Sequence, residues 1–90
     1  MPYRRSAGVT FEVSDGRAVL LDADGDTLTT LNPTGTRIWQ DLDGRRDVGE
    51  LAARLGAVHP EVPVETLRTD VEAFLDELGS DGLVEAVAGA

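Results

Sequence analysis

Two Asp-Gly dipeptides, at residues 15–16 and 24–25, divide the first third of this chain into three short runs. Asp-Gly is a strong signal for a two-residue hairpin turn, because both central positions of that turn need positive φ angles. The runs are VTFEV at 9–13, AVLL at 18–21 and TLTTL at 27–31, and all three are rich in β-branched or apolar residues. The pattern therefore predicts a three-stranded antiparallel meander.

Two-residue turns at both positions would also set the pairing of the strands. Phe11 would lie opposite Leu20, and Leu20 opposite Thr29. One face of the sheet is then the candidate core face, with Val9, Phe11, Val13, Ala18, Leu20 and Leu31, and with Thr27 and Thr29 on the third strand. The other face carries Thr10, Glu12, Val19, Leu21, Leu28 and Thr30. A slip of one residue would exchange the two faces.

Helical spacing replaces the strand pattern after residue 31. Asn32 and Pro33 suit the cap and first position of a helix that runs to Gly44. Asp47, with Glu50 three residues later, predicts a second helix that ends at Gly56. A third helix follows over residues 63–79, with the apolar stripe Val64, Leu67, Val71, Phe74, Leu75 and Leu78. We therefore expect an α+β fold of winged helix-turn-helix type, in which a three-stranded antiparallel sheet precedes three α-helices. It would form a single domain over residues 1–90, with a core at about 8–85.

The charge balance limits the classes of partner. The 90 residues have a formal net charge of −9, and residues 46–90 carry ten acidic side chains against three arginines. A nucleic-acid reader needs the opposite balance, because contacts to phosphate supply most of its affinity. No apolar run approaches the roughly 18–20 residues that span a bilayer, and the N-terminus lacks the apolar region of a signal peptide. We expect a soluble cytoplasmic protein with no nucleic-acid or membrane partner.

No group of residues predicts catalysis or metal binding. Asp22, Asp24 and Asp26 have the spacing of a calcium loop, but Thr27 and Pro33 stand where that loop needs glycine and glutamate. His59 is the only histidine, and the chain has no cysteine. We expect no catalytic residue, no metal and no cofactor.

The third predicted strand is the more informative feature. It lies at an edge of the meander, and edges are normally guarded by charge, proline or a bulge. The run TLTTL has none of these, so it can accept an added peptide strand whose backbone bonds supply affinity. Alternatively, the C-terminal segment or a second copy of the chain covers this edge.

Several short motifs resemble the PqqD family, the recognition elements of pathways that modify ribosomally made peptides. The motifs are Leu31-Asn32, Thr34-Gly35, Ile38-Trp39, Leu-Asp-Gly at 42–44, Phe-Leu-x-x-Leu at 74–78 and Gly-Leu-Val at 82–84. The resemblance covers roughly residues 8–85. It implies three antiparallel strands and three helices, and a non-catalytic protein that binds the leader segment of a precursor peptide.

The resemblance also implies where the leader would bind. It would add to strand 27–31 and lie in a groove against helix 64–78. The residues that we expect to contact it are Thr27, Leu28, Thr29, Thr30, Leu31, Arg68, Val71, Glu72 and Leu75. The last four share one side of the third helix's apolar stripe.

The expected partners follow from the same resemblance. The chain is similar to free-standing leader-binding proteins of lasso-peptide pathways, which work with a transglutaminase-like leader peptidase and a macrocyclase, and it would be a monomer or a weak dimer. A second hypothesis is an adaptor for a radical enzyme in quinone-cofactor or mycofactocin biosynthesis. Winged-helix DNA binding and dimerisation through the same edge remain lower alternatives.

Overall fold

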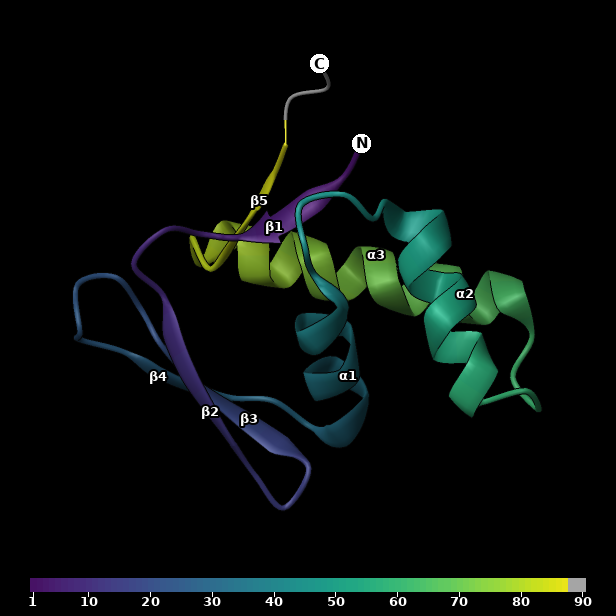
Figure 1. Cartoon of the computed structure of the whole chain (residues 1–90), viewed down its shortest axis with the longest axis horizontal. Coiled ribbons are helices and arrows are strands. Elements are labelled where there is room, and N and C mark those ends of the chain that lie inside the picture. Colours follow the sequence, from purple (N-terminus) through teal and green to yellow (C-terminus); the bar gives the residue numbers. More distant parts are fainter. Residues whose placement is uncertain (88–90) are drawn as a thin grey trace.

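The computed structural model describes residues 1–87 and contains eight elements in two sheets and three helices (Figure 1). The elements are β1 (Tyr3–Arg5), β2 (Thr10–Ser14), β3 (Arg17–Leu21), β4 (Leu28–Thr30), α1 (Pro33–Asp41), α2 (Val48–Val58), α3 (Val64–Ser80) and β5 (Val84–Ala86). The three-stranded antiparallel sheet and the three helices confirm the predicted fold class. Within residues 1–87, no helix is long and apolar enough to cross a membrane.

The sheet β2-β3-β4 has the predicted register. Phe11 pairs with Leu20, and Leu20 pairs with Thr29. Asp15 and Gly16 both have positive φ angles, 55° and 74°, as the two-residue turn between β2 and β3 requires. The β3–β4 connection differs from the expected two-residue turn, because β3 ends at Leu21 and β4 begins only at Leu28. The N–H of Gly25 donates to the carbonyl of Asp22 at 3.0 Å, and only Gly25 of the second Asp-Gly dipeptide has a positive φ angle. The longer loop nevertheless keeps the register that was expected.

The core lies where one face of this sheet meets the helices. Ala18, Leu20 and Leu31 are buried as expected, and Trp39 of α1 has no exposed surface. The half-buried Phe11 meets the Trp39 ring edge-on, with 5.6 Å between the ring centroids. Val13 differs from the expectation, because it is 41% exposed. It lies near the end of the β2–β3 hairpin, which projects beyond α1 in Figure 1.

Both predicted helix starts are present. The Asn32 side chain accepts a hydrogen bond from the backbone N–H of Gly35 at 2.7 Å, and Pro33 opens α1. Asp47 and Glu50 form the reciprocal capping box of α2. However, α2 continues to Val58 beyond its expected end at Gly56. Gly56 instead allows close helix packing, since a Cβ there would lie 3.3 Å from Leu67 Cδ1 of α3.

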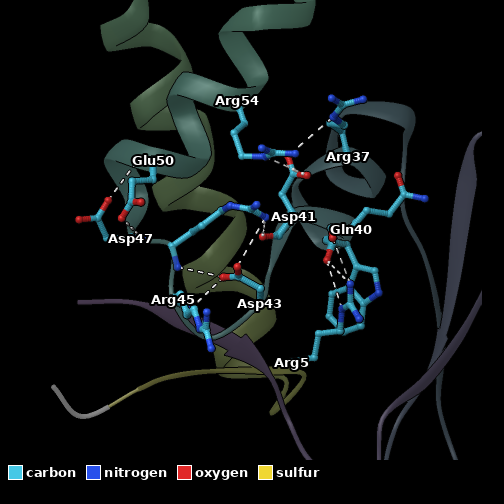
Figure 2. Close-up of polar contacts among 11 residues, drawn as sticks. Arg5, Arg37, Gln40, Asp41, Asp43, Arg45, Asp47, Glu50 and Arg54 are labelled. Atoms are coloured by element: carbon cyan, nitrogen blue, oxygen red, sulfur yellow. Dashed lines mark hydrogen bonds and ion pairs between the residues drawn. The ribbon is translucent and has the colours of Figure 1, made fainter. Parts of the chain in front are cut away.

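The connection between α1 and α2 is held by polar contacts (Figure 2). Asp41 is a buried carboxylate, and its oxygens lie 3.2 Å from Arg54 Nε of α2 and 3.7 Å from Arg37 Nε of α1. The carboxylate of Asp43 accepts hydrogen bonds from the backbone N–H groups of Arg45 and Arg46, at 2.8 and 3.0 Å. These contacts set the path of the chain from one helix into the next.

A second small sheet was not predicted. β1 and β5 pair antiparallel, with Tyr3 opposite Ala86 and Arg5 opposite Val84. β1 also contacts the α1–α2 loop, because the N–H of Gly44 donates to the carbonyl of Tyr3 at 3.0 Å. The first residues, which carried no predicted element, thus join the C-terminal part of the described chain to that loop.

The arrangement of the elements leaves the β4 edge of the three-stranded sheet without a paired strand among residues 1–87. α1 lies between the three-stranded sheet and the α2–α3 pair, and β1 and β5 lie beside α3 (Figure 1). The sheet packs on α1 through β3, and β5 packs on α3. The order β2-β3-β4 places β4 at an edge of the sheet.

Candidate functional site

Along one side of β4, backbone groups have no hydrogen-bond partner within residues 1–87. Residues that exchange both backbone hydrogen bonds with a partner alternate, along an antiparallel strand, with residues that point both groups away. The N–H of Asp22 donates to the carbonyl of Thr27 at 3.2 Å, and the N–H of Leu31 donates to that of Ala18 at 2.8 Å. The pairs Asp22–Thr27 and Ala18–Leu31, each two residues from Leu20–Thr29, are therefore hydrogen-bonded pairs between the two chain segments, and the alternation makes Leu20–Thr29 another. It follows that Leu28 and Thr30 direct their N–H and C=O groups to the open edge.

A groove runs beside this edge, between β4 and one flank of α3. Its centre is lined from the strand side by Thr29, Thr30, Leu31, Asn32 and Gly35, and from the α3 side by Phe74, Glu77, Leu78 and Asp81. Toward the β3–β4 hairpin it continues past Asp22, Thr27 and Leu83. Toward α1 it continues past Thr34, Ile38, Asp70 and Ala73. The three depressions share lining residues, so they form one continuous surface.

The end of β4 is held in place against α1 and α3. A Cβ on Gly35 would lie 2.9 Å from Phe74 Cε1, so glycine at this position allows the aromatic ring to approach the first turn of α1. The buried hydroxyl of Thr36 accepts a hydrogen bond from the N–H of Ala18 at 2.8 Å, which ties α1 to β3. The Asn32-to-Thr36 segment thus positions the strand relative to the groove floor.

Only some of the residues expected to contact the peptide line this groove. Thr27, Thr29, Thr30 and Leu31 line the groove, and Leu28 is 69% exposed at the edge. Val71 and Leu75 are buried in the core.

Arg68 and Glu72 line a different depression, which they share with Met1, Tyr3, Asp47, Val48, Gly49 and Asp76. At 100° per residue, Arg68 and Glu72 lie on one side of the buried stripe, and Asp70, Phe74 and Glu77 lie on the other. The structure therefore brings β4 together with the flank of α3 opposite the expected one. Phe74, Glu77 and Asp81 were not among the expected site residues. Of the three, only Phe74 had a signal in the sequence, because it is a large aromatic residue at the border of the apolar stripe.

The acidic turn beside the groove has a structural role. The carboxylate of Asp22 accepts a hydrogen bond from the backbone N–H of Asp26 at 2.9 Å, and this bond holds the pKa of Asp22 below its ordinary value. Within residues 1–87, no three His, Cys, Asp or Glu side chains are grouped so that they could hold a metal ion. His59 lies in the α2–α3 loop, 3.7 Å from a carboxylate oxygen of Glu61.

Comparison with known proteins identifies the family of the chain. The model of the family described as coenzyme PQQ synthesis protein D (PqqD) matches residues 17–84. The chain belongs to the PqqD family. The matched range contains β3, β4 and all three helices, and it therefore includes both sides of the groove in this PqqD protein.

Two solved structures resemble this PqqD protein over nearly its whole length. One, TbiB1 in complex with the TbiA(beta) leader peptide, is 28% identical, with a TM-score of 0.79 over 96% of this chain and 99% of that one. The other is lasso peptide synthetase B1 complexed with the leader peptide. It is 22% identical, with a TM-score of 0.80 over 94% of this chain and 99% of that one, and supports the fold. No curated protein matches the sequence.

Proposed function

We propose that this PqqD protein is a non-catalytic adaptor that binds the leader segment of a ribosomally made precursor peptide in lasso-peptide maturation. The leader adds as a strand to β4, and its alternate side chains enter the groove against α3. The observation that carries the proposal is the open edge at Leu28 and Thr30, which directs unpaired backbone groups outward beside a partly apolar groove. The complex of the relative TbiB1 with a leader peptide supports it.

The helical side of the proposed peptide site differs from the side expected from the sequence. The contacts on α3 come from Phe74, Glu77, Leu78 and Asp81, which face β4 across the groove. They do not come from the flank that carries Arg68 and Glu72. From the groove the adaptor would present the peptide, in the cytoplasm, to a leader peptidase and a macrocyclase.

The first experiment measures where the leader binds. The leader of the precursor peptide encoded beside this protein is titrated into the labelled protein, and backbone amides are followed by NMR. We expect the largest shift changes at Leu28 and Thr30, because their N–H groups gain partners. Saturable binding that leaves both amides unmoved would rule out strand addition at β4.

A proline substitution tests the backbone bonds directly. Thr30→Pro removes an outward N–H, whereas proline at Thr29 would break the ladder with β3 itself. We expect Thr30→Pro to weaken leader binding by about tenfold or more, because a backbone bond is lost and the ring obstructs the edge. The matched control is Val13→Pro at the open edge of β2, where Ser14 pairs with Arg17 and the alternation turns Val13 outward. Equal loss of affinity in the two variants would contradict the proposal.

A second candidate keeps the same binding site but changes the enzyme served. The matching family model is named for coenzyme PQQ synthesis, which favours delivery to a radical enzyme of quinone-cofactor or mycofactocin type. Leader cleavage by a transglutaminase-like leader peptidase, measured with and without this protein, separates the two. We expect faster cleavage with the protein present. An unchanged rate, together with stimulation of a neighbouring radical enzyme, would favour the second candidate.

A further inference from the structure

The groove beside β4 is acidic along its whole length. Its rim carries the carboxylates of Asp22, Asp70, Glu77 and Asp81, and no arginine lines any of its three depressions. None of these four carboxylates takes part in the ion pairs found among residues 1–87. The opposite flank of α3 differs, since Arg68 Nε there lies 3.9 Å from Glu72 Oε1. The groove therefore has a negative charge that the protein does not compensate locally.

The end of α3 adds to this negative potential. The carbonyls at a helix C-terminus carry a partial negative charge, which basic residues normally offset. The last turn of α3 has no basic residue, and Asp81 is its C-cap. Glu77 and Asp81 thus lie where a carboxylate is unfavourable in the free protein, and a cation in the groove would relieve the repulsion.

The floor of the groove is apolar beneath these carboxylates. Leu31 and Leu78 close it below, and the half-buried ring of Phe74 lies between the two acidic ends. A lysine or arginine has the matching form, because its methylene stem packs on apolar surface while its charged end reaches polar groups. An arginine above Phe74 would also gain a cation–π contact.

The geometry of strand pairing determines which position of the peptide carries this lysine or arginine. Side chains of neighbouring strands share a face when the residues lie side by side, and they alternate between faces along each strand. Thr29 points into the groove, and it lines two of the depressions together with Asp81. A peptide residue beside Thr29 therefore points its side chain toward Glu77 and Asp81.

We propose that the groove selects leader peptides that place a lysine or arginine beside Thr29, where Glu77 and Asp81 bind its charge. This inference rests on the proposed function, since it names the peptide class that the β4 site accepts. The next residue on either side along the peptide faces outward, beside Leu28 or Thr30, and does not enter the acidic groove.

A selection experiment tests the preference without knowledge of the natural leader. A displayed library of random peptides is selected on the intact protein, and NMR identifies those binders that shift the amides of Leu28 and Thr30. We expect lysine or arginine to be enriched at one position of the aligned binders, and affinity to fall as salt rises. Binders at this edge without that enrichment would overturn the inference and leave the proposed function standing. A selection without binders at this edge would count against both.

A charge-matched pair of variants tests the two carboxylates. Glu77→Gln with Asp81→Asn removes two charges from the groove, and Glu65→Gln with Asp76→Asn removes two from the far side of the same helix. We expect the groove variant to bind a selected peptide about threefold to tenfold more weakly, as exposed ion pairs are individually modest. The control variant should bind it nearly unchanged, and replacing the peptide's basic residue by glutamine should remove the difference.

A stability measurement separates recognition from a structural role. If Glu77 and Asp81 mainly serve binding, their neutralisation should leave the melting temperature of the free protein unchanged or higher, because repulsion at the end of α3 is relieved. Equal losses of affinity in the groove and control variants, or a groove variant that melts lower and binds normally, would overturn the inference.

Discussion

The hydroxyl of Thr36 joins the sheet to the first helix through one buried bond. Its oxygen accepts a hydrogen bond from the N–H of Ala18 near the start of β3, and both residues are buried. Thr36→Val keeps the shape of the side chain but leaves that N–H without a partner. We expect a loss of about 1–3 kcal/mol in the free energy of unfolding, the usual cost of a buried unpaired donor.

Chemical denaturation measures this loss, with Thr66→Val as the control. Thr66 is exposed on α3, so its replacement should change the free energy of unfolding little. If the two variants were equally stable, the bond to Ala18 would not contribute as described.

The carboxylate of Asp43, in the α1–α2 loop, makes the stability of the folded chain depend on pH. Hydrogen bonds from the backbone N–H of Arg45, then of Arg46, hold its pKa below the ordinary value in the folded chain. The folded pKa is the lower one, so the stabilisation is complete above the unfolded pKa of about 3.9 and disappears as pH falls through the folded value. Asp43→Asn keeps the acceptor oxygen but removes the charge. We expect the difference in unfolding free energy between parent and variant to shrink on acidification, and a difference independent of pH would contradict this.

At the level of the elements, Arg5 anchors β1 to the end of α1. Its guanidinium carbon lies 4.7 Å from the centre of the Phe11 ring and 5.4 Å from that of Trp39. It also donates to the carbonyls of Trp39 and Gln40, which are among the last of α1 (Figure 2). Partial burial of the guanidinium also lowers the pKa of Arg5 by desolvation. Only arginine has a planar, forked group that can stack on these rings and donate to both carbonyls.

Two neighbouring arginines provide a matched test of this anchor. Arg5→Lys should lower the free energy of unfolding by about 1–2 kcal/mol, because lysine cannot stack on both rings and donate to two carbonyls at once. Arg4→Lys changes an exposed pair with Glu85 and should have almost no effect. Thermal unfolding of both variants measures the difference, and equal melting temperatures would show that the stack contributes little.

The same elements show what the sequence could and could not predict. The register of β2, β3 and β4 was predictable, because an Asp-Gly dipeptide marks the centre of each connection, although only the first forms a two-residue turn. The β1–β5 sheet was not, since three residues per strand give no pattern and their pairing joins opposite ends of the chain. The flank of α3 that faces β4 was also hidden. The apolar stripe marks only the buried side of the helix, and the contact between Gly35 and Phe74 depends on the folded position of α1.

At the level of the whole molecule, the sheet and α3 are joined mainly through α1. β3 packs on α1, α1 packs on α2, and α2 packs on α3. The groove lies between β4 and α3, so a peptide bound there would add to the contacts that already join the sheet to α3, among them the approach of Gly35 to Phe74. Binding should therefore stabilise the fold as a whole as well as the edge strand β4.

Thermal unfolding in the presence of the leader tests this coupling. A ligand that binds only the folded state at 100 times its dissociation constant adds about 2.7 kcal/mol to the free energy of unfolding. We expect the melting temperature to rise with leader concentration, and hydrogen exchange at Leu28 and Thr30 to slow in parallel. Thr30→Pro should abolish both effects at the same leader concentrations, whereas Val13→Pro should retain them. An equal rise with a scrambled leader would show that the stabilisation comes from nonspecific association and not from a strand added at β4.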